Sequence, residues 1–164
     1  MQKQEAEKQF EAHIKINELL IHKVCRMYAY TTADREDLFQ EIVIQLWKAY
    51  PKFRGESKFS TWLYRVALNT AITGLRKKKN FIESRELAEL PDGITEENQK
   101  REEQLGQLYK AIEQLNQVEK AIVMLYMEER TYEEMEEILG ISQGNLRVKM
   151  NRIKDKLRQL AKNN

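Results

Sequence analysis

A row of hydrogen-bond donors near the C-terminus of the chain could read the bases of double-stranded DNA. The donors recur at steps of three or four residues, so they share one face of a helix: Arg147, Asn151, Lys154 and Arg158. In the major groove an arginine can form two hydrogen bonds with guanine, and an asparagine can form two with adenine. A second row at similar spacing is apolar and consists of Leu146, Met150, Ile153 and Leu157. This segment is therefore predicted to be a helix with one face for a core and one for DNA.

The residues before this helix carry the signals of a shorter helix and a tight turn. Thr131 and Glu134 have the spacing of a capping box, which opens a helix. Gly140 can adopt the left-handed conformation that ends a helix, and Ser142 can cap the next one. A helix, a short turn with glycine and a second helix are the outline of a helix-turn-helix motif. The alternative is a surface helix with a solvated basic face, which the capped turn makes the weaker interpretation.

A second group of residues, between 53 and 79, combines aromatic rings with positive charges. The aromatic members are Phe53, Phe59, Trp62 and Tyr64. The basic members are Arg54, Lys58, Arg65 and the run at 76–79. Such a surface suits unpaired bases, because bases stack on aromatic rings while cations neutralise the phosphates. The alternative is that rings such as Trp62 belong to a core, and the sequence leaves that choice open.

Composition and charge favour a helical protein that acts by binding. The chain has 164 residues, of which 33% are charged, and it contains six glycines and two prolines. A net charge of +2 conceals two basic segments, at 76–79 and 147–162, on either side of an acid-rich one at 83–103. No apolar run approaches the roughly 20 residues that span a bilayer, and the N-terminus lacks the apolar region of a signal peptide. A cytoplasmic protein without a membrane partner is expected.

The helical patterns predict an all-α fold of two small domains. We expect the domains at residues 1–80 and 104–164, joined by an acidic flexible linker at 81–103 that contains the turn signal Pro91-Asp92-Gly93.

Several helices are expected in these domains. The first runs from Glu5 to Tyr30, with an apolar stripe of Phe10, Ile14, Leu19, Leu20, Val24 and Met27. The second is capped by Asp34, carries Leu38, Ile42, Leu46 and Tyr50, and ends at Pro51. After a loop at 53–57, the third is capped by Ser60 or Thr61 and runs toward Arg76. In the second domain a helix over 119–127 precedes the helix-turn-helix.

The sequence shows no spacing of residues that is typical of an active site or a metal site. No nucleophile–base set, glycine-rich phosphate loop or metal-ligand spacing is present in the sequence. His13 and His22 are too far apart to form a metal pair on one helical face. Cys25 follows an apolar pattern, so we interpret it as a small buried hydrophobe, with a reactive thiol as the alternative. We expect no catalytic activity, no metal and no cofactor.

Two long segments, 34–79 and 115–160, resemble regions two and four of bacterial RNA polymerase sigma factors of the extracytoplasmic-function (ECF) type. The first contains DREDLFQEIVIQLWKAYPKFRGESKFSTWLYRVALNTA, and the second contains the helix-turn-helix. The resemblance implies a factor that binds core RNA polymerase and directs promoter-specific transcription initiation. It implies contact with duplex promoter DNA upstream and single-stranded DNA downstream, and it makes an anti-sigma factor a candidate partner. The alternative is a helix-turn-helix regulator that acts without polymerase.

The resemblance, together with the helical spacing and the pattern of aromatic and basic residues, gives three sets of expected site residues. Those expected to dock on core polymerase are Asp37, Gln40, Glu41 and Trp47. Those expected to melt the promoter and hold its downstream element are Phe53, Lys58, Trp62, Tyr64, Arg65, Asn69, Arg76 and Lys77, with Asn69 as an important base contact. Those expected to bind the upstream element are Gln143, Arg147, Val148, Lys149, Asn151, Arg152 and Lys156.

Two residues depart from the family pattern. Glu136 stands where a small residue usually lets the two helices of the motif cross closely. We expect either that its methylenes pack inward while its carboxylate reaches the surface, or that the helices cross at a wider distance. Val148 stands where small polar residues are common, and its side chain could contact a thymine methyl group.

Overall fold

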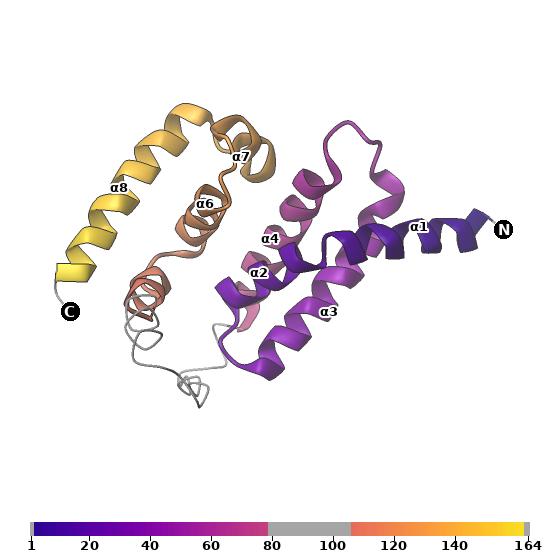
Figure 1. The fold of residues 1–164 in the computed structure, drawn as a ribbon, viewed down its shortest axis with the longest axis horizontal. Coiled ribbons are helices and arrows are strands. Elements are labelled where there is room, and N and C mark those ends of the chain that lie inside the picture. Colours follow the sequence, from indigo (N-terminus) through magenta and orange to yellow (C-terminus); the bar gives the residue numbers. More distant parts are fainter. Residues whose placement is uncertain (1, 79–105, 163–164) are drawn as a thin grey trace. The chain divides into compact units, whose positions relative to one another are not determined.

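The computed structural model describes the backbone of residues 2–78 and 106–162, and their side chains except those of 75–78. Within these ranges the chain is helical and has no strand, which confirms the all-α prediction (Figure 1). It divides into two compact units, of which the first holds residues 2–78 and the second most of 106–162. The predicted domain boundaries and the linker at 81–103 lie outside the described residues.

The first unit contains α1 (Gln2–Ile16), α2 (Glu18–Tyr28), α3 (Thr32–Ala49), a 3-10 turn (Tyr50–Lys52) and α4 (Phe59–Lys78) (Figure 1). Helices α2, α3 and α4 pack against one another in pairs. Their facing side chains are fully or almost fully buried and form the core: Ile21, Val24, Ile42, Leu46, Leu63, Ala67, Leu68 and Ala71. These residues recur at steps of three or four within each helix, so each helix contributes one apolar stripe.

The structure corrects the prediction of a single helix from Glu5 to Tyr30. The helix is interrupted at Asn17, whose side-chain amide donates a hydrogen bond to the His13 carbonyl at 2.8 Å. A short polar side chain can compete in this way for backbone groups and end a helix. The change of direction interrupts the predicted stripe, because Val24 is buried whereas Leu19 is 65% exposed.

The start of α3 also differs from the prediction, while its end agrees with it. The N-cap is Thr31 and not Asp34, because the Thr31 hydroxyl oxygen accepts a hydrogen bond from the Asp34 backbone N–H at 3.1 Å. Asp34 therefore lies in the first turn, where its negative charge is favourable next to the helix N-terminus. At the other end, Pro51 lies in the 3-10 turn that follows Ala49.

Helix α4 begins before the two caps predicted for it. Ser60 and Thr61 lie inside the first turn, and the Thr61 backbone N–H donates to the Lys58 carbonyl at 3.1 Å. Thr61 is buried, so its side chain belongs to the packing of the helix end. The preceding loop was predicted correctly, and Gly55 occupies the left-handed region with φ of 73°.

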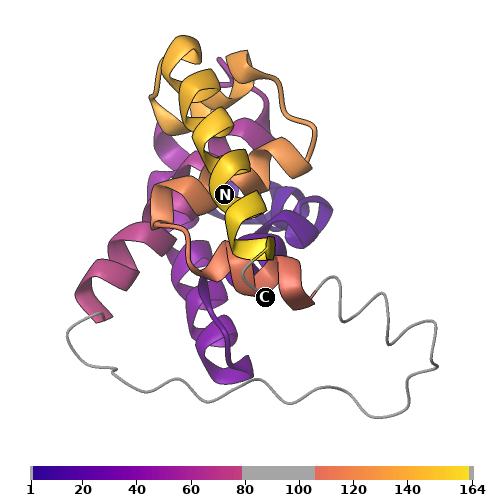
Figure 2. The same ribbon diagram turned by 90° about the vertical axis from the view of Figure 1, so that its left-hand side faces the viewer.

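The second unit contains a helix at residues 106–113, then α6 (Gln117–Met127), α7 (Tyr132–Leu139) and α8 (Gln143–Lys162). Helix α6 opens with a reciprocal capping box between Asn116 and Glu119. Side chains from each of these helices are buried, among them Ile112, Leu115, Ile122, Leu125, Met135, Leu146, Met150 and Ile153. Figures 1 and 2 both show α7 at the N-terminal end of α8, as a helix-turn-helix requires.

The start of α7 and its turn to α8 have most of the predicted local structure, but only half of the expected capping box forms, because Thr131 caps α7 while the Glu134 carboxylate bonds to Arg130 and to the Thr131 hydroxyl. The Thr131 hydroxyl oxygen accepts from the Glu134 backbone N–H at 3.1 Å, and the Glu134 carboxylate accepts from the Arg130 guanidinium at 3.0 Å. Gly140 adopts the left-handed conformation, with φ of 72° and ψ of 19°. The Ser142 hydroxyl oxygen accepts from the Asn145 backbone N–H at 3.3 Å, which confirms Ser142 as a cap of α8.

Candidate nucleic-acid interface

Helix α8 is held by one face and presents the other to solvent. The side chains of Leu146, Met150 and Ile153 are buried against the rest of the unit. The residues predicted to bind the upstream element are exposed except for the half-buried Gln143, and they are Arg147, Val148, Lys149, Asn151, Arg152 and Lys156. Val148 is 48% exposed, so an apolar contact surface lies among these donors. The arrangement is that of a recognition helix.

Helix α7 holds one of the exposed donors of α8. The guanidinium carbon of Arg147 lies 5.0 Å from the centroid of the Tyr132 ring, within the range of a cation–π contact. Tyr132 is the first residue of α7 and is half-buried. The sequence analysis did not include Tyr132 among the site residues. Only its position in the first turn of the shorter helix could have drawn attention to it.

Glu136 caps the N-terminus of α8. Its carboxylate oxygen accepts a hydrogen bond from the Gln143 backbone N–H at 3.1 Å. The first N–H groups of a helix have no partner within the helix, so this bond satisfies one of them. The side chain is exposed and the carboxylate reaches the surface, while the packing of its methylenes stays a prediction.

Three basic side chains farther along α8 are bound within their own unit. The Lys154 ammonium lies 4.9 Å from the centroid of the Tyr126 ring. Lys156 forms an ion pair with Glu119 at 3.1 Å, and Arg158 forms one with Asp155 at 3.3 Å. The basic residues closer to the start of α8, such as Lys149 and Arg152, are exposed. Lys156 and Arg158 are exposed as well, so positive charge faces solvent along the helix, and in its second half part of this charge is shared with acidic partners.

In the first unit, the aromatic residues of the second predicted site form a cluster. The ring centroids of Phe53 and Trp62 are 5.0 Å apart, and those of Phe53 and Phe59 are 5.6 Å apart. All three residues are half-buried, so their rings are partly available at the surface. Exposed polar side chains on or next to α4 are Lys58, Arg65 and Asn69. Arg76 and Lys77 continue α4, and their side chains lie outside the description.

Tyr64 is a core residue and does not belong to this surface. Its side chain is fully buried, on the same side of α4 as Leu68 and Ala71. The spacing of three to four residues explains this position, because Tyr64 falls on the apolar stripe of α4. A direct contact of Tyr64 with DNA is therefore not supported.

Trp47 of α3 packs against aromatic rings of α1 and of the 3-10 turn. Its ring centroid lies 5.0 Å from that of Phe10 and 6.3 Å from that of Tyr50. His13 stacks on Phe59 with centroids 4.3 Å apart, so α1 also contacts the start of α4. Trp47 is half-buried. The three other residues predicted to dock on polymerase are exposed, whereas Trp47 also contributes its ring to packing within the first unit.

These three residues form an exposed face of α3. Asp37, Gln40 and Glu41 are all exposed, and the Gln45 side-chain amide donates to the Glu41 carboxylate at 2.9 Å. Ile44 follows Glu41 by three residues and is 46% exposed. The sequence analysis missed Ile44, although an apolar residue outside the stripe of Leu38, Ile42 and Leu46 was a signal that it did not use.

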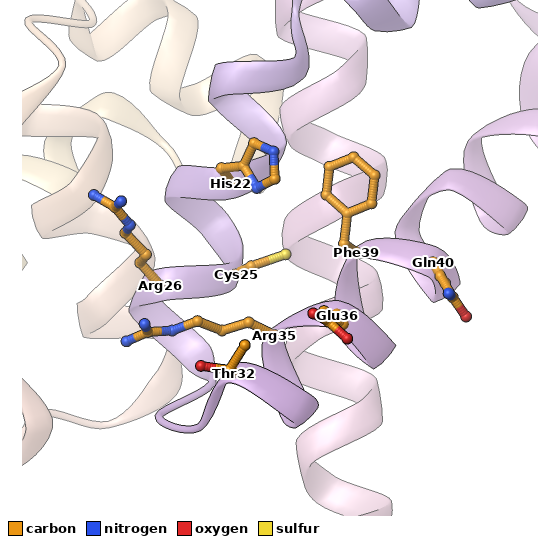
Figure 3. Close-up of a pocket in the computed structure, with 8 residues that line it drawn as sticks. All are labelled: His22, Cys25, Arg26, Thr32, Arg35, Glu36, Phe39 and Gln40. Carbon is orange, nitrogen blue, oxygen red and sulfur yellow. The ribbon is translucent and has the colours of Figure 1, made fainter. Parts of the chain in front are cut away.

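A pocket of about 400 Å³ lies between α2 and α3 and reaches this face at Gln40 (Figure 3). Its lining residues are His22, Cys25, Arg26, Thr32, Arg35, Glu36, Phe39 and Gln40. The His22 and Phe39 rings stack with centroids 4.7 Å apart. Burial raises the pKa of the Cys25 thiol to about 11, although the nearby Arg35 opposes the shift. The thiol is therefore protonated at neutral pH, in agreement with its interpretation as a small buried hydrophobe.

Two further observations concern chemistry and membranes. In the described parts of the chain, no group of three or more His, Cys, Asp or Glu side chains is arranged to hold a metal ion. None of the described helices has the length and apolar character needed to cross a bilayer.

The fold and the exposed α8 define an all-helical protein of two units with a helix-turn-helix in the second. Residues 14–81 match the family model of sigma-70 region 2, and residues 105–157 match that of sigma-70 region 4. Together the two matches cover well over half of the chain. The chain therefore belongs to the sigma-70 family, as a sigma factor of the ECF type.

Curated relatives carry the same family name. The chain is 28% identical over 152 residues to ECF RNA polymerase sigma factor SigW of Bacillus subtilis, covering 85% of this chain and 81% of SigW. It is 40% identical over 87 residues to ECF RNA polymerase sigma factor SigG of Mycobacterium tuberculosis, and it spans only 21% of the length of SigG.

A solved structure with a similar fold is that of the sigma factor RpoE in complex with the anti-sigma factor NepR from Bartonella quintana. The TM-score is 0.72 with 20% sequence identity, and the match covers 94% of this chain and 98% of RpoE. At this identity the similarity supports the fold alone.

Proposed function

We propose that this protein is a promoter-specificity subunit, which binds core RNA polymerase and directs transcription initiation at selected promoters. The observation that carries the proposal is the presence, in one chain, of a recognition helix and a separate aromatic and cationic surface. The first suits duplex DNA and the second suits unpaired bases. The names of SigW and SigG as RNA polymerase sigma factors support the same conclusion.

The upstream promoter element would be read by α8 in the major groove. Arg147 and Asn151 are exposed one helical turn apart, so they can reach neighbouring base pairs. Lys149 and Arg152 flank them and would neutralise phosphates. Val148 would make an apolar contact with a thymine methyl group. Gln143 would act at the start of the helix, where its backbone is already held by Glu136.

The downstream element would be held as single-stranded DNA at α4. Phe53 and Trp62 would stack on bases, since their rings are partly exposed. Asn69 would form hydrogen bonds with a base that has left the stack, whose Watson–Crick edge is then accessible. Lys58 and Arg65 would neutralise phosphates, and Arg76 and Lys77 would extend the cationic surface along the helix.

Core polymerase would dock on the exposed face of α3. Asp37, Gln40 and Glu41 provide polar contacts around the exposed side chain of Ile44. An apolar centre with a polar rim is typical of protein interfaces. Trp47 is half-buried two helical turns after Gln40, so it would add an aromatic contact at the edge of this face.

We propose that the protein acts by binding and has no catalytic activity of its own. Polymerase and chromosomal DNA are its proposed partners, so the cytoplasm is its proposed location. An anti-sigma factor is a further proposed partner, because the similarly folded RpoE was solved in complex with one.

The alternative function is that of a helix-turn-helix regulator that binds DNA without polymerase. Transcription from a random promoter library, with purified core polymerase in the presence and absence of this chain, distinguishes the two. A sigma factor should produce defined start sites only when both proteins are present, and the selected sequences should share an upstream and a downstream element. Tight site-specific binding by the isolated chain, with no effect on transcription by core polymerase, would favour the regulator.

A further inference from the structure

Two contacts connect α7 to the exposed part of α8. The two contact residues on each helix are separated by the same number of positions. Tyr132 contacts the Arg147 guanidinium at 5.0 Å, and Glu136 accepts from the Gln143 backbone N–H at 3.1 Å. Tyr132 and Glu136 are four residues apart, as are Gln143 and Arg147. Residues at this spacing lie one above the other on a helix. One face of α7 therefore meets one face of α8 at both positions.

The Tyr132 ring is placed by groups that no DNA ligand would need to touch. Met135 of α7 and Leu146 of α8 are fully buried, so both helices are anchored in the core of the unit. The left-handed Gly140 donates its N–H to the Glu136 carbonyl at 2.8 Å and so closes the end of α7. Thr131 caps the other end, next to Tyr132. The ring is thus a fixed platform beside the recognition helix.

Contact with the Tyr132 ring restricts the conformations of the Arg147 side chain and leaves its hydrogen-bond donors unengaged by the ring. A free arginine side chain has rotamer entropy to lose when it binds. The guanidinium interacts with the face of the ring, while its five N–H donors lie in its own plane. Arg147 remains exposed, so these donors are available to a base. Stacking thereby lowers the entropy cost of base recognition.

We propose that Tyr132 is a positioning residue for Arg147, which sets the preference at one upstream base pair without itself touching DNA. This inference rests on the proposed function, in which α8 reads the upstream element. Tyr132 orients the guanidinium before binding, and the wrong base pair is rejected because the oriented donors then lack acceptors.

The test uses holoenzyme assembled from the full chain and core polymerase, with competition over all single-base variants of the upstream element. Arg147→Ala first identifies the base pair that Arg147 reads. Tyr132→Leu, which keeps an apolar side chain and removes the ring, should relax the preference at that same base pair by roughly two- to fivefold. Tyr132→Phe keeps the ring and should keep the preference. The double variant should be no more relaxed than Arg147→Ala alone, because both changes act through one contact.

The chain offers a matched control in a second cation–π pair that involves the same helix. Tyr126 of α6 lies 4.9 Å from Lys154 of α8, a member of the donor row that is not among the residues proposed to bind the upstream element. Tyr126→Leu should therefore leave every base preference unchanged. Thermal midpoints verify that each variant folds, and if Tyr132→Leu is unfolded, Tyr132→Met replaces it in the same assay.

Three results would overturn the inference. The first is that Arg147→Ala relaxes the preference at one base pair, while Tyr132→Leu leaves the preference at that base pair unchanged or makes it sharper. The second is relaxation by Tyr132→Leu at a different base pair. The third is an Arg147→Ala variant without effect on any base pair. If core polymerase initiates equally well without the chain, the proposed function fails, and this result is distinct because it does not depend on any variant.

Discussion

The Lys156 ammonium lies 3.1 Å from a carboxylate oxygen of Glu119, and this same oxygen accepts a hydrogen bond from the Asn116 backbone N–H. Lys156 is 47% exposed and Glu119 is 17% exposed, so the ion pair is partly shielded from water. It ties α8 to the cap of α6. A side chain that sequence spacing assigned to DNA is therefore occupied within the protein.

Lys149 and Lys156 should respond differently to substitution. Lys149→Ala should lower the affinity of the holoenzyme for all promoter sequences about equally and reduce the slope of log affinity against log salt by about one, because one phosphate contact is lost. Lys156→Ala should change this slope less and should lower the thermal midpoint, since an intramolecular ion pair is lost. Binding measured at several salt concentrations tests both expectations. Equal changes in slope for the two variants would show that Lys156 leaves Glu119 to bind DNA.

Glu136 should stabilise the start of the recognition helix. Glu136→Ala removes the acceptor for the Gln143 N–H and should lower the free energy of unfolding by about 0.5–1 kcal/mol, which is typical of a lost helix cap. Glu136→Gln keeps an acceptor oxygen and should lose less. Urea denaturation measures the difference, with Glu137→Ala as a control for removing an exposed acid from the same helix. If the Glu136 and Glu137 variants were equally stable, the cap would have no energetic role.

Charge reversal on α3 should separate binding from folding. The double variant Asp37→Lys and Glu41→Lys should bind core polymerase at least tenfold more weakly, by about 1.4 kcal/mol, because like charges would oppose a surface that attracts the wild type. Its thermal midpoint should remain close to that of the wild type, since both residues are exposed. Glu7→Lys combined with Glu11→Lys, at two exposed positions of α1, serves as the control for the same change in net charge. An unfolded double variant would mean that these acids are structural.

Asn69 should act in strand separation and not in upstream recognition. Asn69→Ala should reduce open-complex formation on duplex promoters, because a displaced base would lose its hydrogen bonds to the protein. A template with a pre-melted bubble should restore part of the loss. Permanganate footprinting of unpaired thymines measures the opening. A changed upstream base preference would contradict this role.

The stabilisation of α7 by Glu134 should depend on pH. The Arg130 guanidinium, through its hydrogen bond, lowers the pKa of the Glu134 carboxyl, and the Thr131 cap acts in the same direction. A lowered pKa in the folded state means that this stabilisation is complete above the ordinary glutamate value of about 4.3 and is lost as the pH falls through the folded-state value. At neutral pH the wild type should therefore have a higher melting temperature than Glu134→Gln. The difference between the two melting temperatures should disappear in acid. Thermal melts of both proteins over a pH series test this, and a difference that persists in strong acid would exclude an ionic origin.

Much of the second unit follows from local rules that a sequence displays directly. Thr131, Gly140 and Ser142 act on backbone groups within a few residues of themselves, so their roles as caps and turn were predictable. The buried stripe of Leu146, Met150 and Ile153 follows from helical periodicity in the same way. These features depend on residues that are close in the sequence, so they can be predicted from it.

Other features depend on which surfaces meet after folding. Spacing alone could not show that Lys156 would find Glu119, 37 residues away, or that Tyr132 would lie under Arg147. Spacing assigns Tyr64 to the apolar stripe of α4, and the packing of α4 against α2 and α3 decided that this stripe is buried. Periodicity defines the faces of a helix, but the partner that covers each face is decided by long-range packing, which determines the burial, ion pairs and ring contacts of individual side chains.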